Sequence, residues 1–249
     1  MKAMILAAGL GTRLRPFTND RPKALVEAAG HTLLEITLSR LRSCGVHGVV
    51  INVHHFADML ADYLKANKNF GMHVEISREE VLLDSGGGLK KAAEFLKYHG
   101  HSKNPPFVVH NVDVISTIDL DRMRQLLVDN DALAVVAVQD RETSRYLLFD
   151  DRRQLCGRRA GRDGKPQLVA PASGIQAWAF SGIHVISPRI FPLMTETGAF
   201  SIIDCYLRLA AQGEKILAFR ADEYYWRDLG RPENVAQAAE DVKCRLVRI

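Results

Sequence analysis

The first 140 residues alternate between short apolar runs and amphipathic stretches, and this alternation limits the possible folds more than any other feature. The apolar runs are continuous, which is typical of strands buried on both faces of a sheet. Strands are expected at 2–8, 48–53, 73–77, 106–113 and 132–138, and helices at 32–45, 56–67, 88–98 and 119–130. Such an order predicts an α/β fold, with a parallel sheet covered by helices on both faces.

The pattern changes after residue 140. A hairpin is expected at 145–159, strands at 176–187, 215–221 and 224–230, and helices at 202–213 and 231–246. Because no linker, repeat or low-complexity tract separates the halves, we expect one body over 1–249, with an added antiparallel part that covers a site.

Composition excludes several classes of protein. Hydrophobic residues make up 47% of the 249, enough for a core, yet no apolar run approaches the roughly 20 residues of a membrane span. The four cysteines are scattered without C-x-x-C spacing, which indicates free thiols in a reducing cytoplasm. A net charge of +4 is well below the basic excess of a dedicated nucleic-acid binder.

The stretch "LAAGLGTRLRPFTNDRPKAL" at 6–25 directly follows the first expected strand. Ligands of open α/β sheets bind beyond the carboxyl ends of the strands. Gly9 and Gly11 let the backbone come close to an anion, Arg13 offers a planar fork for phosphate oxygens, and Lys23 adds a point charge. This combination predicts a polyphosphate ligand.

Two familiar glycine loops do not fit this stretch. The dinucleotide fingerprint needs a glycine where Leu14 stands and an acid after the second strand, where His54 and His55 stand. A P-loop needs Gly-Lys-Ser/Thr, which does not follow Gly11. A glycine-rich turn that merely carries surface cations remains an alternative.

The same stretch resembles the signature G-x-G-T-R-x-x-P-x-T-x-x-x-P-K of sugar-1-phosphate nucleotidyltransferases. Further matches follow in order, namely "DSGGGL" (84–89), "NVDV" (111–114), "FSGIHVIS" (180–187), "SIIDCYL" (201–207) and "WRDLGRPENV" (226–235). Within the family, the chain is most similar to the single-domain uridylyltransferases of N-acetylmuramate 1-phosphate. The resemblance implies a Rossmann-like three-layer sandwich, a nucleotide-binding half over 1–140, and a sugar-binding half over 141–249 with a small antiparallel subregion.

The resemblance also implies residue roles on the nucleotide side. Arg13 and Lys23 are implied as catalytic cations that meet the phosphates. The implied nucleotide-binding residues are Leu6, Ala7, Ala8, Gly9, Gly11, Thr12, Arg13, Lys23, Ser85, Gly86 and Gly87. For the three glycines that open the expected helix at 88–98, we expect exposed N–H groups that read the base or ribose. The alternative is a glycine-rich loop capped by Asp84 or Ser85.

On the sugar and metal side, the resemblance assigns Asn111, Gly182 and Asp204 to the sugar, and Asp113 and Asp228 to Mg²⁺, with Asp113 also counted as catalytic. Two carboxylates plus substrate phosphates suit Mg²⁺, which prefers oxygen ligands. Plainer roles remain open for each of these residues. They are a turn or cap acid for Asp113, a surface turn for Asp228, a strand bulge for Gly182, and a capping box with Ser201 for Asp204.

Arginines are concentrated in the expected hairpin, at 152, 153, 158, 159 and 162. A solvated hairpin explains such a run, and closure over the sugar phosphate or contact with nucleic acid are the functional alternatives.

The family resemblance implies a cytoplasmic, Mg²⁺-dependent enzyme of cell-wall nucleotide-sugar synthesis. It would join a nucleoside triphosphate, UTP by preference, to a sugar 1-phosphate, and release pyrophosphate. Alternatives are a mannose- or heptose-1-phosphate guanylyltransferase, a CTP-dependent phosphocholine enzyme, and a non-catalytic sensor of nucleotide sugars. We expect a monomer or small homo-oligomer without nucleic-acid or membrane partners.

Overall fold

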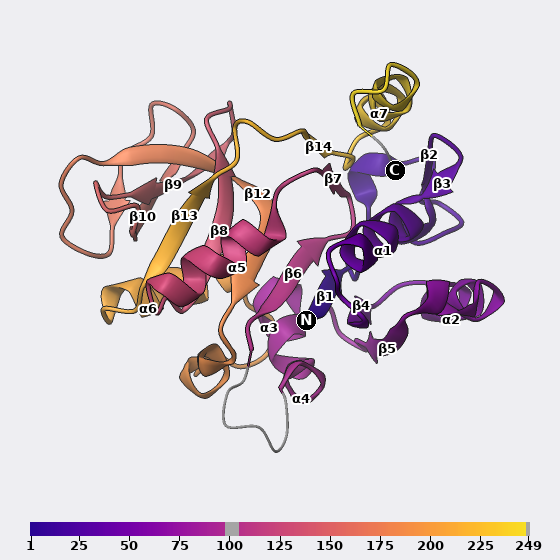
Figure 1. The fold of residues 1–249 in the computed structure, drawn as a ribbon, viewed down its shortest axis with the longest axis horizontal. Coiled ribbons are helices and arrows are strands. Elements are labelled where there is room, and N and C mark those ends of the chain that lie inside the picture. The colour runs from indigo at the N-terminus through magenta and orange to yellow at the C-terminus, as the bar shows by residue number, and fades with distance from the viewer. Residues whose placement is uncertain (98–104, 248–249) are drawn as a thin grey trace.

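The computed structural model describes residues 1–97 and 105–247, and Figure 1 shows the arrangement of their elements. The strands are β1 (Lys2–Leu6), β2 (Glu27–Ala28), β3 (His31–Thr32), β4 (Gly48–Val53), β5 (His73–Arg78), β6 (Phe107–Asn111), β7 (Val114–Ser116), β8 (Ala134–Gln139), β9 (Arg145–Phe149), β10 (Leu155–Ala160), β11 (Gln167–Leu168), β12 (Gln176–Ile186), β13 (Ile216–Arg220) and β14 (Trp226–Asp228). The helices are α1 (Leu33–Ser43), α2 (Ala57–Ala66), α3 (Asp84–Lys91), α4 (Ala93–Leu96), α5 (Leu120–Asp129), α6 (Ile202–Ala211) and α7 (Pro232–Lys243).

The central sheet is mostly parallel, as the sequence predicts. Strands β5, β4, β1 and β6 are neighbours in parallel register, and β13 is parallel to β8. Between β6 and β8, however, lies the long strand β12, which is antiparallel to both. The strands of the first half are therefore parallel to one another, as expected, but a strand from the second half is inserted between two of them.

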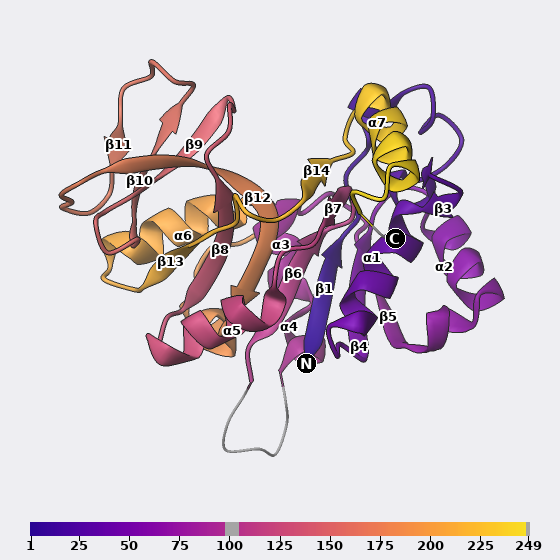
Figure 2. The ribbon, with the colours of Figure 1, turned by 45° about the horizontal axis from the view of Figure 1, so that its top comes forward.

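Helices cover both faces of the sheet and create two cores, which confirms the three-layer sandwich (Figure 2). One core contains side chains of α1, α2, α5 and α7, and the other contains side chains of α3, α4 and α6. Strand β1 divides its residues between them, since Ala3 and Ile5 belong to the first core and Met4 to the second. All three are fully buried, as expected for a central strand.

The antiparallel part lies at the end of the molecule opposite α2 (Figure 1). It consists of β9, β10 and β11, with β9 paired to β12. The expected hairpin at 145–159 is therefore confirmed. No helix in the described part of the chain is both long and apolar enough to cross a membrane, and the four cysteines are free thiols.

The observed helices in this region differ from the single helix expected at 88–98. Helix α3 begins at Asp84, so that the three glycines lie within it, and it ends at Lys91 before the short α4. Residue 98 lies outside the described residues. Glycine has a low helix propensity, but here the segment 198–200 packs against the glycines and overrides it.

Candidate functional site

The loop after β1 is folded back on itself around Gly11. This residue has a φ of 63°, in the region that favours glycine, and a Cβ there would lie 2.9 Å from Thr18 Cγ2. The Thr18 hydroxyl donates a hydrogen bond to the Gly11 carbonyl over 2.9 Å. The glycine is therefore required by both conformation and space, while Thr12 and Arg13 follow it at the exposed start of a 3₁₀ turn.

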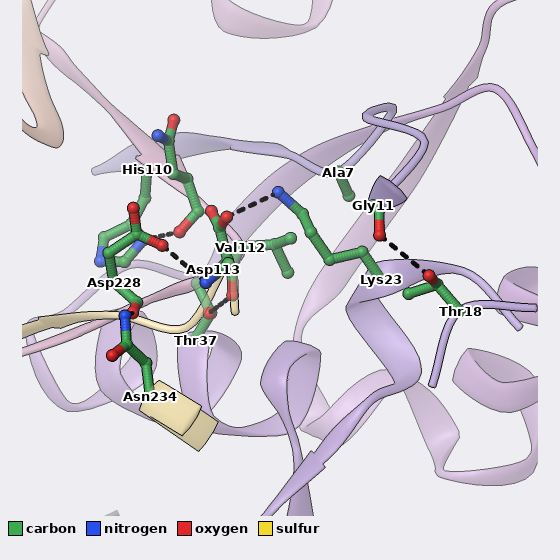
Figure 3. Close-up of polar contacts among 12 residues, drawn as sticks. Ala7, Gly11, Thr18, Lys23, Thr37, His110, Val112, Asp113, Asp228 and Asn234 are labelled. Carbon is green, nitrogen blue, oxygen red and sulfur yellow. Dashed lines mark hydrogen bonds and ion pairs between the residues drawn. The ribbon is translucent and has the colours of Figure 1, made fainter. Parts of the chain in front are cut away.

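Lys23 joins this loop to the end of β6. Its Nζ lies 2.9 Å from Asp113 Oδ2, and the two side chains are only 14% and 8% exposed. A Cβ on Gly9 would lie 3.9 Å from the same Nζ, so Lys23 extends across the glycine loop. Figure 3 shows Lys23 approaching Asp113 from one side, while Asp228 lies on the opposite side of Asp113.

Asp113 and Asp228 are brought together from distant parts of the chain. Strands β7 and β14 form a separate two-stranded sheet, in which Asp228 faces Val114. The N–H of Leu229 donates to the Asp113 carbonyl over 2.7 Å, and the N–H of Gly230 donates to Asp228 Oδ1 over 2.6 Å. The backbone thus fixes both acidic residues relative to each other.

Arg13 reaches the same place, as the surroundings of Gly230 show. A Cβ on Gly230 would lie 2.8 Å from Asp228 Oδ1, 2.9 Å from Arg13 Nη2 and 3.3 Å from Asp113 Oδ2. Two carboxylates and two cations, counting Lys23, therefore converge from four chain segments. Carboxylate oxygens are ligands for a hard divalent cation, and the cations suit phosphate oxygens.

No group of three or more His, Cys, Asp or Glu residues that could hold a metal occurs in the described residues. A cation held by Asp113 and Asp228 would therefore take its other ligands from substrate or water, which is how Mg²⁺ is commonly bound.

The glycines of α3 have a different environment from the one expected. The N–H groups of Gly86 and Gly87 donate to the carbonyl of Phe200, over 2.9 and 3.3 Å, and both glycines are buried. The hydroxyl of Ser85 accepts from the N–H of Ile202 over 3.1 Å. The expectation that the two glycines expose free N–H groups is therefore wrong, because close packing against residues 198–200 uses them.

Two buried polar residues that the sequence did not single out hold this region together. Asn52, 3% exposed, accepts from the N–H of Ala7 over 2.8 Å and donates to Glu79 Oε1 over 2.8 Å. Glu79, also 3% exposed, accepts from the N–H of Leu83 over 2.9 Å. The chain from Ala7 through Asn52 and Glu79 links the end of β1 to the start of α3. The sequence signal that could have identified them is a polar residue at the end of each of the strands at 48–53 and 73–78.

The other residues near the end of β1 are placed as follows. Ala7 and Ala8 are buried, at 4% and 6% exposed, and the Leu6 carbonyl accepts from the N–H of Val112 over 3.2 Å. Backbone hydrogen bonds therefore hold this stretch beside the segment that carries Asp113.

Of the expected sugar residues, Asn111 and Gly182 are neighbours. Gly182 has a φ of 76°, and a Cβ there would lie 2.8 Å from Asn111 Nδ2. The register between β12 and β8 shifts around Gly182, between Phe180 and His184. Gly182 therefore has the features of a strand bulge with a close neighbour, which is the plainer of the two roles expected for it.

Asp204 is engaged elsewhere, since its carboxylate accepts from Arg158 over 2.6 Å. Helix α6 is capped by Ser201, whose hydroxyl accepts from the N–H of Ile203 over 3.2 Å. A capping box also needs the Asp204 carboxylate to return to the N–H of Ser201, and this bond is absent from the described residues.

The arginines of the hairpin differ in their surroundings. Arg152 and Arg153 are exposed in the turn, in keeping with a solvated hairpin. Arg159 is half-buried over the ring of Tyr146, 5.2 Å from its centroid, and Arg162 lies 3.8 Å from the Glu142 carboxylate. Ion pairs are therefore made by Arg158 and Arg162, whereas within the described residues the Arg159 side chain has only the ring contact and a buried Nε without a hydrogen-bond partner.

The sequence matches known nucleotidyl transferases over almost its whole length. The family model described as "Nucleotidyl transferase" matches residues 2–244. The chain is 35% identical over 239 residues to N-acetylmuramate alpha-1-phosphate uridylyltransferase of Caulobacter vibrioides, covering 93% of this chain and 92% of the relative. It is 28% identical to UTP–glucose-1-phosphate uridylyltransferase of Synechocystis, over all of this chain and 65% of that one.

The fold agrees as well. A crystal structure of a putative glucose-1-phosphate thymidylyltransferase of Bacillus anthracis matches with a TM-score of 0.77 at 19% identity, covering 100% of this chain and 97% of that one. The chain therefore belongs to the nucleotidyl transferase family, as one of its sugar-1-phosphate nucleotidyltransferases.

Proposed function

We propose that the chain transfers a uridylyl group from UTP to N-acetylmuramate 1-phosphate, in the cytoplasm, as a step of cell-wall nucleotide-sugar synthesis. The choice of substrates is supported by the uridylyltransferase of Caulobacter vibrioides, which matches nearly the whole length of both chains. The observation that carries the chemistry is the convergence of Arg13, Asp113 and Asp228 around Gly230, with Lys23 bound to Asp113.

In this reaction an oxygen of the sugar phosphate attacks the α-phosphorus of UTP, and pyrophosphate leaves in line. The attacking group is already an anion, so no protein nucleophile is needed. Lys23 and Arg13 stabilise the negative charge that grows on the transferring and leaving phosphates. The hydrogen bonds of the glycine loop and of the strand ends hold these groups in place before the substrates arrive.

We further propose that Asp113 and Asp228 hold Mg²⁺. The donor set fits, because both groups are hard oxygen ligands, and the missing side chain of Gly230 leaves the space between them free. When bound, Mg²⁺ would neutralise phosphate charge and orient the reacting groups. The triphosphate offers Lys23 a second anion, so that Asp113 Oδ2 is released from its present ion pair.

Substrate recognition completes the proposal. Leu6, Ala7, Ala8 and Gly9 would lie along the nucleoside, Gly11 and Thr12 along the triphosphate, and Ser85, Gly86 and Gly87 near the base. Because the two α3 glycines are buried and Phe200 accepts from their N–H groups, their contribution would be indirect, by letting α3 lie close to residues 198–200. Asn111, Gly182 and Asp204 would contact the sugar.

The test is a matrix of initial rates of pyrophosphate release. UTP, GTP, CTP and dTTP are each combined with the 1-phosphates of N-acetylmuramate, N-acetylglucosamine and mannose, in the presence of Mg²⁺. UTP with N-acetylmuramate 1-phosphate should give the highest kcat/KM. A higher value with GTP and mannose 1-phosphate would contradict the substrates, and no turnover with any pair would contradict the activity.

A further inference from the structure

Asp228 lies on a strand that has little support of its own. Strands β14 and β7 are three residues each and form a separate two-stranded sheet. An isolated pair of short strands is marginally stable in water. The position of Asp228 must therefore depend on what β14 packs against.

Helix α7 supplies that support through an unusual residue. The inner stripe of α7 is formed by Val235, Ala238 and Asp241, at the three-residue spacing where an apolar side chain is expected. Asp241 is nevertheless a carboxylate that is only 4% exposed. A buried charge costs free energy unless it is well paired, so its partners define its role.

Two of these partners belong to β14 and the residue before it. Asp241 Oδ2 accepts from the Tyr225 hydroxyl over 2.6 Å and from Arg227 Nε and Nη2 over 2.8 and 2.7 Å. Gln237, on α7 itself, donates to Oδ1 over 3.2 Å. The hydroxyl bond from Tyr225, together with the charge of Arg227, lowers the pKa of Asp241, so the group stays ionised.

The connection from Asp241 to the acidic pair is short. Arg227 directly precedes Asp228, and Asn234 of α7 donates to the Asp228 carbonyl over 2.8 Å. The N–H of Leu229 then binds the Asp113 carbonyl. A buried ion pair is weak evidence for stability, but fixing the register of two elements is its best-attested use.

We propose that Asp241 is a positioning residue, which anchors β14 to α7 and so holds the Asp228 carboxylate at its distance from Asp113. The inference rests on the proposed metal site. The geometry of this site is then set from outside it, by a carboxylate that touches neither substrate nor metal.

The test compares Asp241→Asn with Glu240→Gln, which removes a carboxylate from the exposed face of the same helix turn, where Glu240 pairs with Lys243. Mn²⁺ binding is titrated by electron paramagnetic resonance on full-length protein saturated with α,β-methylene-UTP, against samples without protein. Circular dichroism and the unfolding midpoint report whether each variant is folded. Asp228→Asn serves as the reference for loss of a ligand.

Folded Asp241→Asn should bind Mn²⁺ at least tenfold more weakly than the wild type, whereas Glu240→Gln should bind it equally well. Amide hydrogen exchange should rise in β7 and β14 but not in β1. If Asp241→Asn does not fold, Tyr225→Phe and Arg227→Gln take its place, with the same expected direction.

The positioning role of Asp241 would be wrong if folded Asp241→Asn, or both Tyr225→Phe and Arg227→Gln, bound Mn²⁺ as tightly as the wild type. If Asp228→Asn itself leaves Mn²⁺ affinity unchanged, the proposed metal site fails, and the anchor falls with it. The two failures are therefore distinguishable.

Discussion

Lys23 Nζ lies 2.9 Å from Asp113 Oδ2, although the two residues are 90 positions apart and both side chains are largely buried. This ion pair joins the glycine loop after β1 to the segment after β6. It places a cation on the carboxylate that would hold a metal in the proposed reaction. We propose that Lys23 pairs with Asp113 in the free chain and with a phosphate in the complex.

The variant Lys23→Met should separate these two roles. Turnover should fall roughly a hundredfold or more, because one charge-stabilising group is worth on the order of 3 kcal/mol in the transition state. Mn²⁺ affinity of the nucleotide-free protein should rise instead, since Asp113 is released. Lys65→Met, which removes an exposed lysine of α2, is the matched control. Weaker Mn²⁺ binding in Lys23→Met would show that the lysine does not compete with the metal.

Gly230→Ala should abolish most activity without unfolding the protein. Its φ is not in the left-handed region, so an alanine adds no backbone strain, but its Cβ would lie 2.8 Å from Asp228 Oδ1 and 2.9 Å from Arg13 Nη2. Gly48→Ala is the control, because a Cβ there makes ordinary contacts at 3.6 Å. Steady-state kinetics and unfolding midpoints check both. Full activity in Gly230→Ala would mean that the three groups do not work from their present positions.

Gly86→Ala should destabilise the fold and weaken nucleotide binding. A Cβ there would overlap the ring of Phe200 and lie 2.8 Å from its carbonyl, which forces α3 away from residues 198–200. Overpacking of this kind costs about 1–3 kcal/mol. Denaturant unfolding should show this loss of stability. Gly86→Ala should cost less free energy of unfolding when it is made in the Phe200→Ala variant than when it is made in the wild type. An equal loss in both backgrounds would locate the strain elsewhere.

Stability should fall as the pH falls from about 6.5 towards 4. Burial lowers the pKa of His110 to about 4 and that of His184 to about 3. Both rings are neutral in the folded chain, whereas the unfolded chain takes up protons once the pH drops below the ordinary value near 6.5. The unfolded state therefore binds more protons, and the free energy of unfolding decreases by a few kcal/mol, on the order of 3 per histidine.

Urea unfolding between pH 4.5 and 7.5 measures this dependence. His110→Gln should flatten the curve, and His73→Gln, at an exposed position, should not change it. An unchanged slope in His110→Gln would show that this histidine is already protonated in the folded state.

The sequence predicted the layers of the fold better than it predicted the contacts between distant residues. Local periodicity is enough to locate β1, β4 and α1, because each has its own apolar pattern. It carries no information on non-local pairing, so the antiparallel strand β12 between β6 and β8 could not be anticipated. The family resemblance named Asp113 and Asp228, and the structure brings them together.

The misses have a common physical cause. Asn52, Glu79 and Asp241 are single polar residues whose role exists only through partners distant in the sequence. The glycines of α3 were expected to face a ligand, but Phe200 lies against Gly86. A glycine in a sequence shows that something comes close, without showing whether that is a ligand or another part of the chain.

The proposed metal site is tested most directly by the position of Mn²⁺ in crystals grown with α,β-methylene-UTP, located by anomalous diffraction. We expect a Mn²⁺ peak coordinated by Asp113 and Asp228, with Lys23 moved from Asp113 to a phosphate oxygen. A peak away from these two carboxylates, or nucleotide bound while Lys23 keeps its ion pair with Asp113, would show that the site is not the one proposed.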